Sequence, residues 1–417
     1  MTKEKSTVPR LRFPGFTDAW KQRKLGEVAT FAKGNGYSKK DLVIEGSPII
    51  LYGRLYTKYE TVISEVDTFV SVEDNKNSVV YSEGGEVLVP ASGESSLDIA
   101  RASVVAKKGI ILGGDINIIR LHSEIFPVFL ALTISNGKQQ KGLSKRAQGK
   151  SVVHLHNSDL KKVDLDFPTH PEQEAIGSFF SDLDQLITLH QRKLDDVKEL
   201  KKALLQKMFP KGNGNDFPEL RFPEFTDAWK QRKLGEVSKR VTRRNKELIS
   251  SLPLTISAQH GLVDQEEFFN KQVASKDVSS YYLIKKGEFA YNKSYSNGYP
   301  WGAIKRLDRY EMGVLSTLYI VFKPTSLICS DYLVSYYDTV NWYKEVSMIA
   351  AEGARNHGLL NIAPNDFFKT RLFIPTLPEQ EAIGSFFSDL DQLITLHQRQ
   401  LDHLKLLKKA LLQQMFI

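Results

Sequence analysis

The chain has little of what many structural and catalytic sites are built from. Its 417 residues include one cysteine, Cys329, which excludes an internal disulfide framework and a cysteine-based zinc site. No apolar run approaches the length of a membrane span, and the first residues, MTKEKSTVPR, lack the apolar segment of a signal peptide. These absences predict a cytoplasmic protein.

Motifs of catalysis are also missing. There is no glycine-rich loop for S-adenosylmethionine and no Asn/Asp-Pro-Pro-aromatic tetrad for amino-group methylation. The stretch GLSKRAQGKS, residues 142–151, resembles a phosphate-binding loop, but six residues separate Gly142 from Gly149 where the nucleotide motif has four. His154 and His156, two apart on one face of a possible strand, have no acidic or cysteine cluster beside them. The sequence therefore predicts no catalytic residues, no metal site and no cofactor bound by this chain.

The formal charge of +8 is a moderate bias towards a polyanionic partner. A basic protein without such a partner is the alternative that charge alone leaves open.

Two stretches of the chain occur twice. PEQEAIGSFFSDLDQLITLHQR fills residues 171–192 and returns unchanged at 378–399. LRFPGFTDAWKQRKLGEV, residues 11–28, returns at 220–237 with only Gly15 replaced, by Glu224. The chain is therefore a duplication, in which each half has the short signature, a long middle segment and the second repeated stretch. The aromatic and basic residues of the signature favour an apolar clasp with a solvated basic face over a surface that stacks on nucleic acid.

The second repeated stretch predicts a long helix in each half, 170–210 and 377–417. A proline stands in the first turn of each, where no hydrogen bond is lost. Residues at steps of four and three then form the seam of a coiled coil, with a histidine as a polar interruption. The helix-pairing residues are Ile176, Phe180, Leu183, Ile187, His190 and Leu194 in the first copy, and Ile383, Phe387, Leu390, Ile394, His397 and Leu401 in the second.

Charge predicts the direction in which the helices pair. Acidic residues such as Glu172 and Asp184 fill the early turns, and lysines such as Lys201 and Lys207 fill the later ones. An antiparallel pair sets acid beside base, whereas a parallel pair sets acid beside acid. Antiparallel pairing would bring His190 and His397 together as a buried pair that fixes register. Two separate core helices and solvent-facing histidines are the alternatives.

The middle segments, residues 29–169 and 238–376, share little sequence although their flanks are nearly identical. Both contain short β-rich runs broken by glycine and asparagine, and a helical stretch near 126–135 or 330–349. We therefore predict an α+β fold with an internal pseudo-two-fold repeat: two globular domains joined by two long helices that form an antiparallel coiled coil. Residues 1–28 would form a leader and the first signature, and 211–237 a linker and the second signature.

Both middle segments contain side chains suited to DNA. Arginine suits guanine and asparagine or glutamine suits adenine in the major groove, and Lys145, Arg146 and Lys150 would lie on a flexible loop that contacts phosphates. Each candidate alone is better explained as a surface or turn residue than as a base contact, and the set as a whole supports DNA binding more strongly than any of its members. The candidate DNA-binding residues are Arg54, Tyr56, Lys58, Lys145, Arg146, Gln148 and Lys150 in the first segment, and Asn292, Lys293, Tyr295, Asn297, Arg355, Asn356 and His357 in the second.

The two LRFPxFTDAWKQRKLGEV signatures, the two PEQEAIGSFFSDLDQLI helices and the unlike middle segments together resemble the DNA specificity (S) subunit of type I restriction-modification systems, over essentially the whole chain. The resemblance implies that the middle segments are target recognition domains, each reading half of a bipartite, asymmetric site in double-stranded DNA. It also implies two methyltransferase (M) subunits, which carry S-adenosylmethionine and methylate adenine N6, and two restriction (R) subunits, which use ATP and Mg.

Two other functions are weighed against this one. A self-contained nuclease or methyltransferase is disfavoured by the missing motifs. A scaffold that binds only proteins, without reading DNA sequence, stays open.

Overall fold

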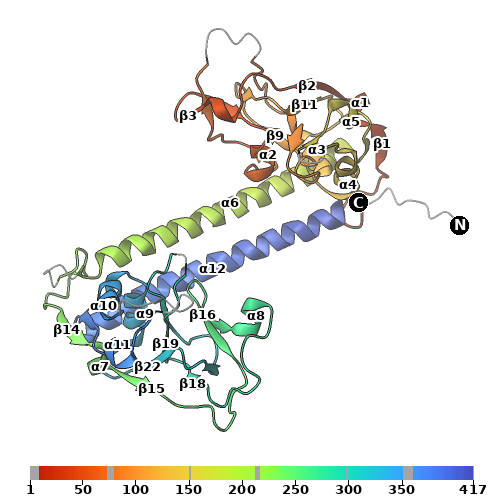
Figure 1. Ribbon diagram of the computed structural model, residues 1–417. Helices are drawn as coiled ribbons and strands as arrows, with labels where there is room; N and C mark the ends of the chain where they lie inside the picture. The colour runs from red at the N-terminus through yellow and green to blue at the C-terminus, as the bar shows by residue number, and fades with distance from the viewer. Residues whose placement is uncertain are drawn as a thin grey trace. The chain divides into compact units, whose positions relative to one another are not determined.

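The fold is described from a computed structural model, for residues 9–72, 79–149, 152–211, 217–296, 298–350 and 360–416. The chain divides into two compact units. The first comprises residues 1–192 with 397–417, and the second residues 193–396. Figure 1 colours the first globular domain from red to yellow-green and the second from green to blue. The mixture of helices and strands confirms the α+β class.

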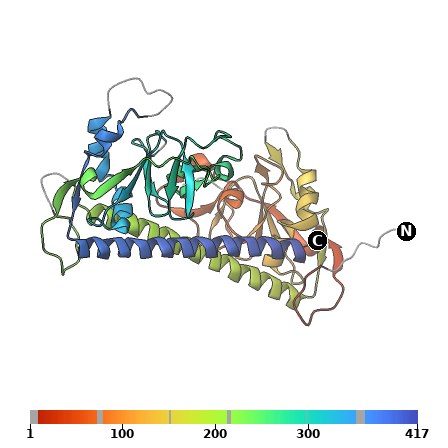
Figure 2. The same cartoon turned by 90° about the horizontal axis from the view of Figure 1, so that it is seen from below.

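Both repeated stretches form long helices. α6 spans His170–Lys207 and α12 spans Leu377–Met415, each beginning one residue before its proline. Figure 2 shows α12, in dark blue, as one unbroken helix. The predicted ranges were slightly too long at their C-terminal ends. Each helix contributes residues to both units, since the unit boundary falls between residues 192 and 193 in α6 and between 396 and 397 in α12.

The first domain is built on a five-stranded sheet in the order β2-β11-β7-β9-β5. A four-stranded sheet, β10-β4-β6-β3, and the pairs β1-β13 and β12-β8 complete it. The strands are β1 (Lys21–Lys24), β2 (Ala29–Lys33), β3 (Leu42–Val43), β4 (Ser47–Ile50), β5 (Val62–Ile63), β6 (Phe69–Val70), β7 (Val87–Pro90), β8 (Ser92–Gly93), β9 (Ser103–Val105), β10 (Ile111–Leu112), β11 (Ile116–Leu121), β12 (Val153–His154) and β13 (Asp164–Phe167). The helices are α1 (Leu25–Val28), α2 (Arg54–Thr57), α3 (Pro127–Ile134), α4 (Gly137–Arg146) and α5 (Asn157–Leu160).

The second domain has a four-stranded sheet in the order β15-β22-β19-β20 and the pairs β14-β23, β16-β17 and β18-β21. Its strands are β14 (Lys230–Lys233), β15 (Ser238–Val241), β16 (Leu254–Ser257), β17 (Gly261–Asp264), β18 (Tyr282–Lys285), β19 (Phe289–Asn292), β20 (Ala303–Arg306), β21 (Met312–Leu315), β22 (Ile320–Pro324) and β23 (Arg371–Ile374). The helices are α7 (Leu234–Val237), α8 (Gln265–Phe269), α9 (Ser330–Tyr337), α10 (Asn341–Ile349) and α11 (Pro364–Phe367).

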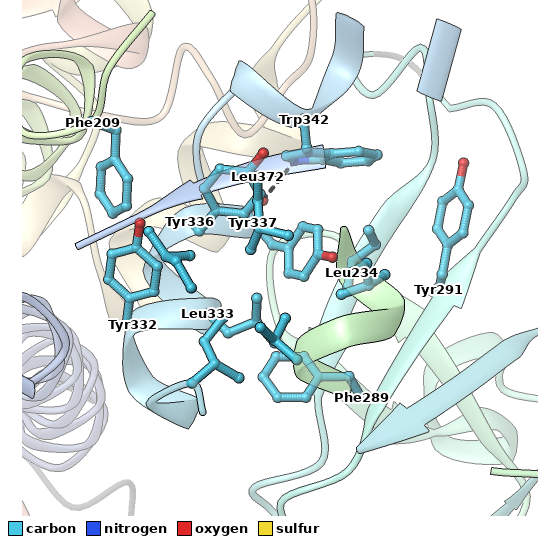
Figure 3. Packing of buried hydrophobic residues seen from close by; sticks show 14 of the residues in the cluster. Phe209, Leu234, Phe289, Tyr291, Tyr332, Leu333, Tyr336, Tyr337, Trp342 and Leu372 are labelled. Carbon is cyan, nitrogen blue, oxygen red and sulfur yellow. Dashed lines mark hydrogen bonds between the residues drawn. The ribbon is translucent and has the colours of Figure 1, made fainter. Parts of the chain in front are cut away.

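The two domains have the same arrangement of strands and helices, here called the shared framework, although their sequences share little. The strand order β2-β11-β7-β9 in the first matches β15-β22-β19-β20 in the second, and each sheet is followed by a helix pair, α3 with α4 or α9 with α10. The cores are filled differently. Aliphatic side chains such as Ile50, Leu88 and Ile118 fill the first. Aromatic rings fill the second (Figure 3), and the ring centroids of Tyr291 and Phe367 stack 4.9 Å apart. Different residues thus fill one architecture.

Three local predictions are corrected. The basic stretch around Gly142 is not a flexible loop up to Arg146, because Gly137–Arg146 forms α4, whose Leu143 is fully buried and anchors it. The predicted helix over 330–349 is two helices, separated at residues 338–340. His154 and His156 do not share a strand, since His154 ends β12 and His156 precedes α5. Among the described residues, no helix is long and apolar enough to cross a membrane.

Candidate nucleic-acid interface and its helical frame

The repeated sequences form the same contacts in both units. The Arg12 guanidinium donates to both carboxylate oxygens of Glu172, at 2.8 and 2.6 Å. The Arg221 guanidinium donates to Glu379 in the same way, at 2.7 Å twice. Both carboxylates are buried, and each hydrogen bond raises the pKa of the arginine. A paired, bidentate geometry of this kind joins the signature to the first turn of its helix.

The signature forms an apolar clasp, as predicted. Trp20 is buried, and its ring centroid lies 5.7 Å from that of Phe129 in an edge-to-face arrangement. Trp229 is buried likewise, and its ring centroid lies 6.1 Å from that of Phe209. Basic residues of the signature such as Lys21 lie on the exposed side of the same segment. The apolar side chains thus fix the signature in each domain, while lysines such as Lys21 stay in solvent.

Within each unit, the segments of α6 and α12 run in opposite directions. In the first unit the ring of Phe180 lies 6.3 Å from that of Phe416, and Lys408 is paired with Asp184. In the second, Lys201 lies 2.7 Å from Asp391, and the ring of Phe209 lies 6.1 Å from that of Phe387. In both units, residues near the end of one helix segment contact residues near the start of the other. This is the antiparallel direction that the charge order predicts.

The two seam histidines meet. The rings of His190 and His397, both in the first unit, are 5.7 Å apart. The Nδ1 atom of each is buried, and no described residue hydrogen-bonds to it. Of the other predicted pairing residues, most are buried, whereas Leu390 and Ile394 are half-buried. The hypothesis that the pair fixes register remains a prediction.

A segment that the sequence analysis overlooked brings the first set of candidate residues together. Residues 94–102 connect β8 to β9, and Arg101 donates from Nη1 to the carbonyl of Tyr56 at 3.0 Å. The hydroxyl of Ser96 lies 2.9 Å from that of Ser144 in α4, which ends with the candidates Lys145 and Arg146. The predicted groups around residues 54–58 and 145–148 therefore lie on either side of this segment.

The exposed end of β12 adds a histidine to this surface. The Ser92 hydroxyl, on a buried residue, hydrogen-bonds to His154 Nδ1 at 3.0 Å, while the His154 residue is exposed. The backbone groups of Gln148 and His154 also bond reciprocally, at 3.1 and 2.8 Å. His154 is therefore an oriented polar side chain beside a predicted base-reading glutamine. We name the surface of Tyr56, Arg101, Lys145, Gln148 and His154 the first reading face.

Arg54 and Lys58, at the ends of α2, have a different environment. Both pair with the carboxylate of Asp67, Arg54 at 3.2 Å. The side chains of Lys58 and then Arg54 hold the pKa of Asp67 below its ordinary value despite partial burial. Their charge is therefore partly compensated within the domain, and they are weaker candidates for phosphate contact than Lys145.

The second set of candidates lies at the end of β19. Lys293 is half-buried, which lowers its pKa, and its Nζ donates to the carbonyl of Ile362 at 3.3 Å. Asn292 accepts from the amide of Ser294 at 3.0 Å, and Tyr295 is exposed. The candidates Lys150, Asn297, Arg355, Asn356 and His357 lie outside the residues that the structure describes.

Both groups of candidate residues occupy one corner of the shared framework. In the first domain, the amide of Leu155 donates to the carbonyl of Ala91, just after β7. In the second, the amide of Leu360 donates to the carbonyl of Lys293, just after the corresponding strand β19. One backbone corner thus presents Ser92, Gln148 and His154 in one domain and Lys293 and Tyr295 in the other.

Comparison with known proteins finds similarity to one family. Residues 17–199 match the family model of the Type I restriction modification DNA specificity domain. The type I restriction enzyme MjaVIII specificity subunit of Methanocaldococcus jannaschii is 22% identical over 231 residues, 54% of this chain and 50% of that protein. The putative type I restriction enzyme MjaX specificity subunit of the same organism is 24% identical over 230 residues, 52% of each. The chain therefore spans about half the length of these curated relatives.

One solved structure has the same fold over nearly the whole chain. The crystal structure of the S subunit of a type I restriction-modification system from M. genitalium has a TM-score of 0.63 to this chain, at 15% identity. The superposition covers 98% of this chain and 99% of that one. The likeness therefore extends over both halves, beyond the segment that the family model matches.

Proposed function

Because this chain is similar to the specificity subunits of type I restriction-modification systems, we propose that it belongs with them and reads double-stranded DNA through two target recognition domains, each contacting one half of a bipartite, asymmetric site. The observation that carries the proposal is the shared corner, where one backbone framework displays unlike polar side chains in the two domains. A shared framework would place both domains on DNA in the same way, and different side chains would read different bases.

On the first reading face, we assign different roles to charged and neutral side chains. Lys145, exposed at the end of α4, would contact a phosphate, while Gln148 and His154 would contact base edges. The buried hydroxyl of Ser92 restricts the His154 ring, which lowers the entropy lost when it contacts a base. The second domain would use Lys293 and Tyr295, together with the candidates outside the described residues.

This assignment predicts two distinguishable mutant effects. His154→Ala should weaken binding to the recognised duplex by about 1–3 kcal/mol and relax specificity at one position of one half-site. Lys145→Met should weaken binding to all duplexes equally and lower the slope of log K against log salt by about 1. Titration of cognate and scrambled duplexes at several salt concentrations, with the S–M complex, measures both. Equal losses on both duplexes for His154→Ala would contradict its role in base reading.

For partners, we propose two M subunits that carry S-adenosylmethionine, with R subunits that use ATP and Mg completing the assembly. Exposed leucines at repeated helix positions support equivalent binding of two identical partners. The side chains at Leu186 and Leu393 are 40% and 38% exposed, and those at Leu189 and Leu396 are 47% and 50% exposed. Two identical apolar surfaces can each bind one copy of the same partner protein.

Charging this apolar surface should prevent assembly with the M subunit. Leu189→Glu combined with Leu396→Glu should lower the affinity for M at least about tenfold, equivalent to 1.4 kcal/mol, because an apolar contact is replaced by a desolvated carboxylate. The folded state should be unaffected, since both side chains are half in solvent already. Co-purification and analytical ultracentrifugation test this, with Leu318→Glu, 57% exposed in the second domain, as the control. Full assembly by the double variant would contradict the proposed surface.

We further propose that α6 and α12 pair as an antiparallel coiled coil that sets the number of unread base pairs between the half-sites. Support comes from the opposite chain directions within each unit and from the seam residues. The alternative, a scaffold that binds only proteins, predicts that the purified S–M complex protects no particular DNA sequence. Protection of a defined duplex from nuclease digestion separates the two functions.

A further inference from the structure

A buried ionic cluster connects the second domain to both helices of its unit. Lys201 of α6 donates to Asp391 of α12 at 2.7 Å and to Asp338 at 2.9 Å. Asp338 follows the last residue of α9 and also accepts from Lys305 of β20 at 2.7 Å. The side chains of Lys201 and Asp338 are 13% and 19% exposed. α6, α9 and β20 therefore meet at the Asp338 carboxylate, and the Lys201 ammonium connects this carboxylate to α12.

The charges in this cluster are mutually stabilised. Burial alone would raise the pKa of Asp338, but Lys305 and Lys201 outweigh it and lower that pKa below its ordinary value. Burial would likewise lower the pKa of Lys201, and Asp338 and Asp391 outweigh it, so that the pKa is raised. Both groups are therefore charged near neutral pH. Because a buried ion pair is strong only in a narrow geometry, it restricts orientation more than it adds stability.

The first unit contains the corresponding cluster. Lys408 of α12 pairs with Asp184 of α6, which also accepts from the Thr61 hydroxyl at 2.9 Å. Glu60 lies 3.5 Å from the same lysine. Thr61 is held in the domain by its carbonyl, which accepts from the Val104 amide at 2.8 Å. Lys201 and Lys408 occupy the same position of the repeat, as do Asp184 and Asp391.

The frame therefore supplies one lysine and one aspartate to each domain, and the domain supplies its own partner: Asp338 in the second, Thr61 with Glu60 in the first. We propose that these two lysine–aspartate clamps fix the orientation of each recognition domain on its helix pair, and so determine how strictly the protein selects the gap between half-sites. The inference rests on the proposed function. Lys201 and Lys408 are positioning residues, which act on DNA through the orientation of a domain.

The clamp of the second unit can be tested by replacing Lys201, because removal of this lysine leaves no isolated buried charge. In Lys201→Met, Asp338 keeps Lys305, and the Asp391 side chain is 45% exposed and can be hydrated. A loosened domain should tolerate half-sites at the wrong separation. Loss of folding stability, in contrast, would lower methylation at all sites in proportion.

The test is a methylome of cells that express the chain with its M partner. We expect wild type to methylate one gap length, and Lys201→Met to raise methylation at gaps one base pair shorter or longer, relative to the correct gap, by about tenfold. Asp338→Asn, which removes the domain's own carboxylate charge, should give the same shift. Lys201→Arg should restore the wild-type ratio, since a guanidinium can bridge two carboxylates. Lys202→Met, an exposed neighbour on the same helix, is the matched control and should change nothing.

The outcomes separate the two proposals. A bipartite motif whose gap ratio is unchanged in both Lys201→Met and Asp338→Asn would overturn the clamp alone. An equal shift in Lys202→Met would also overturn it, because the effect would then follow charge and not position. A wild-type methylome without a bipartite motif would overturn the proposed function, and the clamp with it.

Discussion

Arg221→Met should lower the free energy of unfolding of the second unit by about 3–5 kcal/mol. The Glu379 side chain is 0% exposed, and Arg221 gives it two hydrogen bonds of 2.7 Å. Without the guanidinium, the carboxylate keeps the longer bond from Trp229 Nε1, at 3.3 Å. A buried charge that loses its partner costs far more than an exposed one. Urea unfolding followed by tryptophan fluorescence measures the change.

Two controls assign the effect to the buried charge. Arg232→Met removes an exposed pair, in which the side chains of Arg232 and Glu236 are 50% and 48% exposed, and should cost less than about 1 kcal/mol. Arg221→Met with Glu379→Leu removes both charges and should recover most of the loss. A cost below 1 kcal/mol for Arg221→Met alone would show that the pair does not hold the signature on the helix.

Lengthening both helices by seven residues should change the gap in the recognised DNA and leave the bases unchanged. Seven residues at 1.5 Å each add about 10 Å, or about three base pairs at 3.4 Å each. One heptad preserves the seam, so insertions after Leu194 and after Leu401, at the same position of the repeat, keep the pairing in register. Methylome mapping of this variant gives the gap and the half-site letters separately.

A one-sided insertion is the control for the lengthened helices. Seven residues after Leu194 alone would shift α6 against α12 and separate Lys201 from Asp391, now at 2.7 Å. We expect this variant to lose site-specific methylation. If the matched insertion changes the half-site letters while the gap stays constant, the helices do not act as a spacer.

The helical frame was readable from the sequence because its information is local and repeated. The seam of residues such as Ile176 and Phe180 has a helical period, and the order of charges gave the direction that the Lys201–Asp391 pair displays. The contacts of the signature were not readable. Arg12 and Glu172 are far apart in the chain, and no periodic pattern joins them.

The reading face was only partly predictable. Residues 94–102, between β8 and β9, have no helical or strand period, and their importance comes from long-range contacts with Tyr56 and Ser144. Gly142 suggested a loop, but burial of Leu143 stabilises helix α4 instead. The shared domain framework was hidden because side chains as different as Leu88 and Phe289 fill the two cores. The common corner is defined by backbone hydrogen bonds, from Leu155 to Ala91 and from Leu360 to Lys293, which cannot be predicted from the sequence.

The most direct test of the central claim is the methylome of wild-type chain expressed with its M partner in cells that lack other adenine methylation. The account predicts one motif with two different half-sites, a fixed gap, and methylated adenine N6 in both halves. Exchange of residues 29–169 for another domain of the family should replace one half-site only. Methylation without a defined motif, or one continuous motif that survives this exchange, would contradict the claim that two unlike domains read the DNA.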